Sequence, residues 1–202
     1  ADPEITAFGV GVDIPGAFKG SGFLSLGHTA DGHSTMSGAL DLTLVPLRLR
    51  IAAKIKIEQF TADDGETKTG VLTTIEVNFP VGIPLGNSGL GIFGFLGLLG
   101  VNFTRTEDQF AGDPTPALAW LRATGGDPTN IDFWRAADKH WAFGVGAVLG
   151  TMEGGFLFNL KGMLILELPG PRLLLMMKAN ILIPKLPVKG TAEAMLLAVI
   201  DL

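Results

Sequence analysis

The residues of this 202-residue chain that are best suited to chemistry are two histidines and a carboxylate in the segment Gly27–His33. His28, Asp31 and His33 could be ligands of zinc or iron, because imidazole and carboxylate groups commonly bind these metals. A glycine-rich segment imposes no fixed geometry, however, and the spacing identifies no further ligand. We therefore predict a polar turn here, and no metal site.

Other catalytic signals are weak. The chain has no cysteine, and no serine lies in the G-x-S-x-G pattern of a nucleophile elbow. The glycine-rich run Asn87–Gly91 lacks the lysine and the helix that follow a phosphate-binding loop. The sequence thus predicts a protein that is not an enzyme and uses no cofactor.

A basic stripe is a second candidate site. Four residues at alternate or near-alternate positions could bind phosphate or an acidic partner: Arg48, Arg50, Lys54 and Lys56. Charged residues on the outer face of an antiparallel sheet are ordinary, however. We favour a solvated sheet face that is balanced by Glu58 and Glu76.

Aromatic residues form the third candidate site, for an apolar ligand: Trp120, Trp134, Trp141, Phe93 and Phe95. The tryptophans are expected to anchor a lid over a sheet or barrel end, with a ligand-binding role as the alternative. The segment 90–101, with glycine at every third position, predicts a strand and turn against which another sheet packs. Membrane insertion of this segment is its alternative.

Composition limits the function classes. The 20 acidic and 15 basic residues give a net charge of -5, which argues against a nucleic-acid partner. Only 17% of the residues are charged, against about 25% in typical soluble domains, and the mean hydropathy is +0.40. Such a chain buries both faces of its sheets, associates with itself or a larger polypeptide, or meets a hydrophobic ligand.

The first strong strand signal is a hairpin. Apolar residues alternate with charged ones from 47 to 57, a second alternating run covers 71–79, and Asp64-Gly65 marks the turn. A turn centred on Gly65 predicts that Ile55 faces Ile75. It also places Lys54 opposite Glu76 on the polar face.

Further strands are expected on both sides of this hairpin. Val45-Pro46 indicates a bulge, an edge or a break before the first hairpin, and residues 8–26 predict one or two glycine-rich strands. A second hairpin is expected from 156 to 183, split at Pro169–Pro171 and buried on both faces near its turn. The tail from 191 to 202 fits a helix and a strand equally well.

Only the segment 113–141 is expected to be helical. Asp113-Pro114 and Asp127-Pro128 each place a capping residue before a proline. They predict two short helices, over 117–123 and 133–140, as an insert in a single β-rich domain or fragment that covers residues 1–202.

Four glycine- and leucine-rich segments can be considered together: Gly11–Pro15 with Gly20–Phe23, Gly89–Arg105, Leu164–Arg172 and Leu197–Leu202. They resemble an uncharacterised bacterial and fungal domain family of unknown function that occurs within very large proteins. The resemblance implies one module of a longer protein with no assigned activity.

The sequence therefore predicts a mainly β fold, with long antiparallel strands in a curved sheet, sandwich or incomplete barrel, plus the helical insert. The leading functional hypothesis is a non-enzymatic structural or binding module of a large secreted or surface-associated protein. A carrier that holds a lipid between the sheet and the insert is one alternative. A membrane-active segment is the other.

Overall fold

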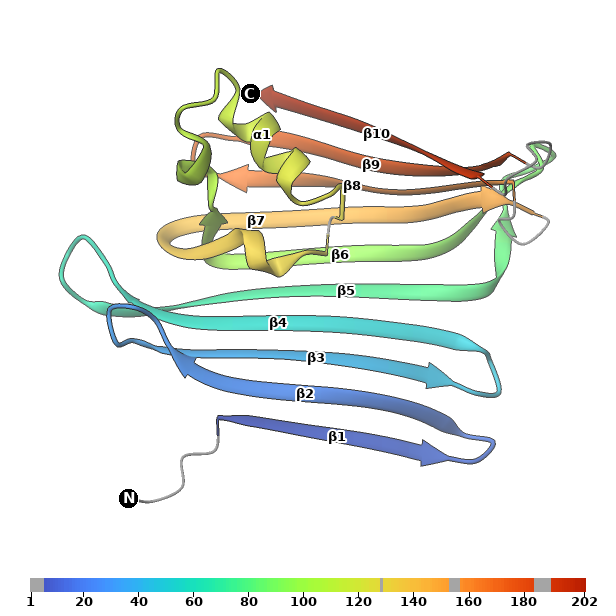
Figure 1. Cartoon of the computed structure of the whole chain (residues 1–202), viewed down its shortest axis with the longest axis horizontal. Helices are drawn as coiled ribbons and strands as arrows, with labels where there is room; N and C mark the ends of the chain where they lie inside the picture. Colours follow the sequence, from blue (N-terminus) through green and yellow to red (C-terminus); the bar gives the residue numbers. More distant parts are fainter. Residues whose placement is uncertain (1–5, 128, 153–156, 184–189) are drawn as a thin grey trace.

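The computed structural model describes residues 6–127, 129–152, 157–183 and 190–202. Ten antiparallel strands form one open, curved sheet in which each strand lies beside its neighbours in sequence (Figure 1). The strands are β1 (Ala7–Ile14), β2 (Phe18–His28), β3 (Ser34–Leu44), β4 (Leu49–Thr61), β5 (Thr67–Pro84), β6 (Leu90–Arg105), β7 (Trp134–Thr151), β8 (Phe158–Leu168), β9 (Arg172–Ile183) and β10 (Gly190–Asp201). The predicted mainly β fold is confirmed.

The predicted strands are also confirmed. Residues 8–26 form β1 and β2, the break at Val45-Pro46 is the turn between β3 and β4, and the glycine-rich segment 90–101 is strand throughout, in β6. The described strands form one sheet, so the expectation that another sheet packs against this segment is wrong. The tail, which fitted both a helix and a strand, is strand β10.

The β4–β5 hairpin pairs in a different register from the predicted one. Ile55 faces Thr73, and Ala53 faces Ile75, so the turn is centred on Asp64. Gly65, with a φ of 80°, follows that centre, and its N–H donates to the carbonyl of Ala62. The prediction failed because it placed the centre of the turn at Gly65. The glycine instead occupies the positive-φ position that directly follows the centre. The shift of two residues leaves each side chain on its predicted face.

The insert between β6 and β7 contains one α-helix, α1 (Pro116–Ala123), and two 3-10 turns, η1 (Glu107–Phe110) and η2 (Ile131–Phe133). The predicted second helix over 133–140 is wrong, because this segment begins β7. Asp113 and Asp127 do not cap helices. Each carboxylate accepts a hydrogen bond from the backbone N–H two residues later, at Thr115 (2.8 Å) and Thr129 (3.0 Å), which forms a local turn.

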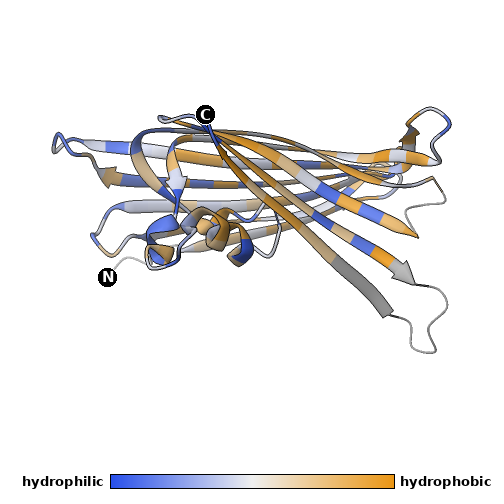
Figure 2. Cartoon of the chain, turned by 90° about the horizontal axis from the view of Figure 1, so that it is seen from above, coloured by the Kyte–Doolittle hydropathy of each residue, from blue (hydrophilic) through white to orange (hydrophobic). Residues whose placement is uncertain are grey.

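The insert covers one face of the sheet, which we call the inner face, and the sheet curves around it (Figure 2). Helix α1 contacts β10, and η2 contacts β4 and β5. The hydrophobic core lies between the insert and strands β5–β10. It consists of Leu72, Leu96, Leu98, Phe103, Trp120, Leu121, Ile131, Trp134, Ala136, Ala142, Val148, Met163, Ile165, Leu174 and Met176.

Glycines on β7 make room for this core. Gly144 and Gly146 face Leu98 and Leu96 across the β6–β7 ladder. A Cβ atom at Gly144 would lie 2.9 Å from the Cβ of Leu98, and one at Gly146 would overlap the carbonyl oxygen of Gly162. Large side chains on β6 and β8 can therefore pack only because β7 has none at these positions.

The second predicted hairpin is present as β8 and β9, but its burial differs from the prediction. Ile165 and Leu174 on the inner face are fully buried, whereas Leu164 on the opposite face is 42% exposed. The prediction of burial on both faces is wrong near the turn, because one sheet with an insert on one side buries only that side.

Candidate functional site

The face of the sheet that points away from the insert, the outer face, is the most unusual surface of the molecule. Successive side chains of a strand point to opposite faces, so the strand register assigns each residue to one of them. On β1–β5, β8, β9 and the described side chains of β10, and over Phe95–Val101 and Trp141–Ala147, no outer residue is Asp, Glu, Lys or Arg. Its large exposed residues are Phe8, Val10, Val12, Ile14, Leu24, Leu26, Leu40, Ile75, Phe95, Leu99, Trp141, Phe143, Val145, Leu164, Ile181, Leu196 and Ile200.

The outer face is large and regular. On β4 its apolar residues run from Leu49 to Ile57, and on β8 from Leu160 to Leu168. At about 3.4 Å per residue, each run is about 27 Å long, and nine spacings of about 4.8 Å make the face roughly 43 Å wide. Gln59 and Thr61 on β4 continue into Thr67 and Thr69 on β5, so the apolar band ends at a polar rim there.

The inner face of the strands carries the charge. Its charged residues are Asp13, Lys19, Asp41, Arg50, Lys54, Lys56, Glu58, Lys68, Glu76, Arg105, Lys161, Glu167, Arg172, Lys178 and Asp201. Many are paired with one another: Arg50 with Asp41, Lys56 with Glu58 (3.4 Å), and Lys161 with Glu76 (2.6 Å). The sheet therefore separates a charged side from an uncharged one.

Asp127 of the insert joins this inner network, and its carboxylate lies 3.5 Å from the Lys161 ammonium group. Burial alone would raise the pKa of the Asp127 carboxyl. The backbone N–H of Thr129 and the charge of Lys161 outweigh that effect, so the pKa lies below the ordinary aspartate value. The insert is thus held to the sheet by a charged contact as well as by the core.

A second charged cluster centres on Arg105, whose side chain is only 4% exposed. Its Nε donates to Glu167 (2.6 Å), its Nη2 lies 2.8 Å from Glu107, and its guanidinium group lies over the ring of Trp120 at 5.2 Å. Among the described residues its Nη1 has no hydrogen-bond partner. A buried arginine with two carboxylates is a typical structural ion pair.

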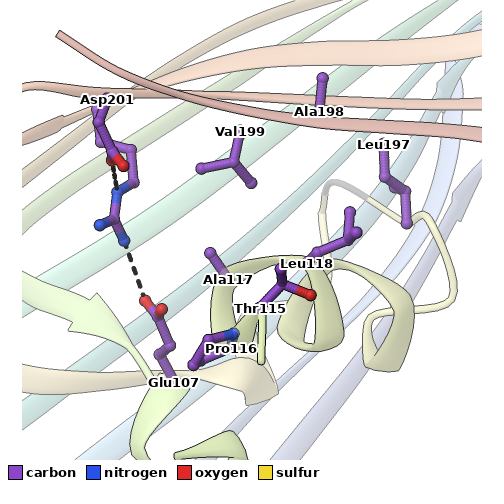
Figure 3. Close-up of a pocket in the computed structure, with 10 residues that line it drawn as sticks. Glu107, Thr115, Pro116, Ala117, Leu118, Leu197, Ala198, Val199 and Asp201 are labelled. Atoms are coloured by element: carbon purple, nitrogen blue, oxygen red, sulfur yellow. Dashed lines mark hydrogen bonds and ion pairs between the residues drawn. The ribbon is translucent and has the colours of Figure 1, made fainter. Parts of the chain in front are cut away.

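Arg172 links this cluster to the last strand, because it pairs with both Glu107 and Asp201. These residues border a cavity of about 460 Å³ between α1 and β10, in which Ala117 and Leu118 face Leu197 and Val199 (Figure 3). The cavity is open to solvent and mainly apolar. At one end of the cavity, the carboxylates of Glu107 and Asp201 already pair with the guanidinium group of Arg172.

The structure separates the predicted aromatic site. Trp120 and Trp134 are 0% and 2% exposed, cross edge to face at 5.4 Å, and form the core beneath the insert. Trp141 lies instead on the outer face, stacked on Phe143 at 6.2 Å. Phe95 is also on the outer face, whereas Phe93 packs against the core. The three tryptophans are close in sequence, and this proximity misled the prediction. Only Trp120 lies in the insert, whereas Trp134 is the first residue of β7 and packs against Trp120.

The prediction of a solvated basic face is wrong for Lys54 and Lys56, whereas Arg50 is half exposed and the predicted balance by Glu58 is present as a contact with Lys56. The stripe points toward the insert: Lys54 Nζ donates to the carbonyl of Thr129 (3.2 Å), and Lys56 Nζ donates to that of Trp134 (2.8 Å). Arg50 pairs with Asp41, and Arg48 lies in the β3–β4 turn rather than on the face. The alternation of apolar and basic residues was predicted correctly. Alternation alone, however, does not show which face of the strand packs against the insert.

The histidine segment forms the predicted turn. The N–H of Gly32 donates to Thr29, and His33 Nε2 lies 2.9 Å from the hydroxyl of Thr61. Within the described ranges, no group of three or more His, Cys, Asp or Glu side chains is suited to hold a metal ion. No helix in the described part of the chain is long and apolar enough to cross a membrane.

Sequence reasoning missed both the outer face and the Arg105 cluster. Comparisons of the chain with protein-family models, with curated proteins and with solved structures found no match. The candidate site therefore depends on the geometry of the fold, in which the uncharged outer face is the dominant feature.

Proposed function

We propose that this protein is a non-enzymatic module whose outer face contacts the hydrocarbon part of lipids. The observation that carries the proposal is the separation of charge between the two faces. Strands β1–β5, β8 and β9, the segments Phe95–Val101 and Trp141–Ala147 and the described side chains of β10 place their charged residues on the inner face and only uncharged ones on the outer face. Random placement would put charged residues on both faces.

Exposing the outer face to water is unfavourable in free energy. Val145 is 70% exposed, Phe8 62% and Leu196 53%, and these residues belong to different parts of the same surface. Monomeric soluble proteins rarely expose contiguous apolar patches of more than a few hundred Å². A surface of roughly 27 by 43 Å exceeds that limit and requires an apolar partner.

The height of the band favours lipid as that partner. A run of about 27 Å lies close to the ~30 Å thickness of the hydrocarbon core of a bilayer, and the polar rim at Gln59 and Thr69 would lie at its edge. Trp141 is near the same end of its strand, beside Leu168. Tryptophan is enriched where hydrocarbon meets water.

The curvature of the sheet favours a fluid partner over a rigid one. Because the sheet curves around the insert (Figure 2), the outer face is convex. Two convex faces of identical copies touch over a small area, whereas acyl chains adapt to any contour. Core side chains such as Trp120 and Phe103 fill most of the space between the sheet and the insert. The cavity of about 460 Å³ between α1 and β10 is bordered by the ion pairs of Arg172 with Glu107 and Asp201, so the geometry favours lipid outside the sheet over lipid held beneath the insert.

Flotation with small vesicles of phosphatidylcholine tests the proposal. The native protein should float with the vesicles and remain bound in high salt, since the contact involves no charge. Val145→Arg, at an exposed outer position, should lower the partition coefficient at least ten-fold, because a charge in hydrocarbon costs about 2–4 kcal/mol. Ala123→Arg, at the exposed end of α1, is the matched control and should float like the native protein. Absence of flotation, or equal flotation of the two arginine variants, would overturn the proposal.

A further inference from the structure

The two edge strands of the sheet carry a second inference, independent of the lipid contact. Among the described residues, β1 pairs only with β2, and β10 pairs only with β9. Each edge strand of an antiparallel sheet has a row of N–H and C=O groups that point away from the sheet. These groups can pair with a further extended segment.

In the described part of the chain, both edge strands lack several of the features that usually prevent such pairing. Strand β1, of sequence AFGVGVDI, contains no proline and no lysine, and all eight of its residues are exposed. Strand β10 also lacks proline and lysine. Natural proteins often block edges with these residues or with bulges, and the described pairing of β1 with β2 and of β10 with β9 shows no bulge. Uninterrupted edges of this kind are typical of strands that pair.

We infer that copies of this protein pair edge to edge, β10 of one copy with β1 of the next. The direction of the strands is correct for this pairing. In a sheet of ten sequential antiparallel strands, the first and the last run in opposite directions. Joining β10 to β1 of another copy therefore continues the antiparallel order.

The side chains also match. The outer residues Val10 and Val12 of β1 would lie beside Leu196 and Ala198 of β10, so the outer face would stay uncharged across the junction. Asp13 and Asp201 lie near the C-terminal ends of their strands. In an antiparallel pair those ends are far apart, so the two carboxylates do not repel each other.

Pairing of β10 with β1 uses both edges of every copy. A two-fold pairing of β1 with β1 would leave β10 open in each copy. The head-to-tail arrangement therefore satisfies more backbone groups per copy than a two-fold dimer through β1, and the cross-linking of single variants distinguishes it from two-fold pairing at either edge.

Cysteine cross-linking tests the inference cleanly, because the native chain contains no cysteine. A copy with Val10→Cys or Val12→Cys is mixed with a copy that carries Ala198→Cys, and the mixture is oxidised. Covalent dimers should form in the mixture at least ten-fold more than in either variant alone; the two valine positions cover adjacent registers. Equal dimer formation by the single variants, or no dimer in any mixture, would overturn the inference.

Two variants separate this inference from the proposed function. Val10→Lys should convert dimers and larger species to monomers in native mass spectrometry, whereas Ala123→Lys should leave them unchanged. Val145→Arg should lose vesicle binding and keep the β1–β10 cross-link. A native protein that is monomeric at high concentration in both water and vesicles would contradict the edge pairing and leave the lipid contact intact.

Discussion

The ammonium group of Lys56 donates a hydrogen bond to the carbonyl oxygen of Trp134, 2.8 Å away and 78 residues later in the chain. It also lies 3.4 Å from Glu58 and 5.8 Å from the centre of the Phe103 ring. This contact fixes the orientation of β4, because a lysine that reaches the insert must lie on the inner face. The apolar residues between the lysines then point outward.

Replacing Lys56 with methionine should lower the free energy of unfolding by about 1–3 kcal/mol, because the carbonyl of Trp134 and the carboxylate of Glu58 lose their partner. Urea denaturation monitored by tryptophan fluorescence measures the change. Lys19→Met is the control: Lys19 is an exposed inner-face residue of β2, and its substitution should change stability by less than about 0.5 kcal/mol. Equal effects of the two substitutions would contradict the assigned role of Lys56.

Two neighbouring residues of β8 should differ sharply in their tolerance of truncation. Ile165→Ala removes a fully buried side chain of the core and should cost about 2–5 kcal/mol. Leu164→Ala, at a 42% exposed outer position, should cost about 1 kcal/mol or less in water, since little burial is lost. If both truncations cost the same in thermal or urea unfolding, the assignment of the two faces is incorrect.

Gly146 should not accept even one extra methyl group. A Cβ there overlaps the backbone of Gly162 and lies 3.0 Å from Leu96, so Gly146→Ala should destabilise the protein by about 1–3 kcal/mol. The same substitution at Gly11 of edge strand β1 meets only a carbonyl oxygen 4.0 Å away and should be close to neutral. Circular dichroism melting curves of the two variants provide the comparison, and a neutral Gly146→Ala would refute the close packing of β7.

The stability of the protein should depend on pH through Asp127. Its pKa in the folded protein lies below the ordinary value of 3.8, so the ionised carboxylate stabilises the folded state. That contribution is fully present above the unfolded-state pKa and disappears as the pH falls through the lowered folded-state pKa. Asp127→Asn should therefore be less stable than the native protein at pH 7, and the difference should diminish in acid.

Asp132→Asn is the control for this pH dependence, because Asp132 is an exposed residue of η2. Its unfolding free energy should follow that of the native protein at every pH. A difference between Asp127→Asn and the native protein that stays constant down to pH 2 would show that the contact with Lys161 and Thr129 acts without ionisation.

The sequence carries most of the secondary structure, because alternation and turn residues are local signals. The strict pattern from Leu47 to Ile57 predicts the strand β4, and Pro169–Pro171 predicts the β8–β9 turn. The register was missed by two residues because it depends on where the loop reverses, which Gly65 marks only indirectly.

The orientation of the faces could not be derived from local patterns. Alternation shows that Ile55 and Lys56 lie on opposite faces, but hydrophobic residues are expected inside only if the protein meets water. Here the core forms on the face where Leu72, Leu98 and Ile165 meet the insert. One signal of the uncharged face is present in the sequence. No charged residue occurs at the alternate positions Leu40, Leu42 and Leu44, or at the alternate positions from Leu49 to Ile57.

Tryptophan fluorescence provides the most direct test of lipid contact at the outer face, because Trp141 is 42% exposed there while Trp120 and Trp134 are buried. In vesicles with brominated acyl chains, which quench only by contact, the fluorescence of the native protein should fall relative to that in unbrominated vesicles. The Trp141→Phe variant should show little or no such quenching. Equal emission of the native protein in the two kinds of vesicle, or equal quenching in Trp141→Phe, would contradict the account.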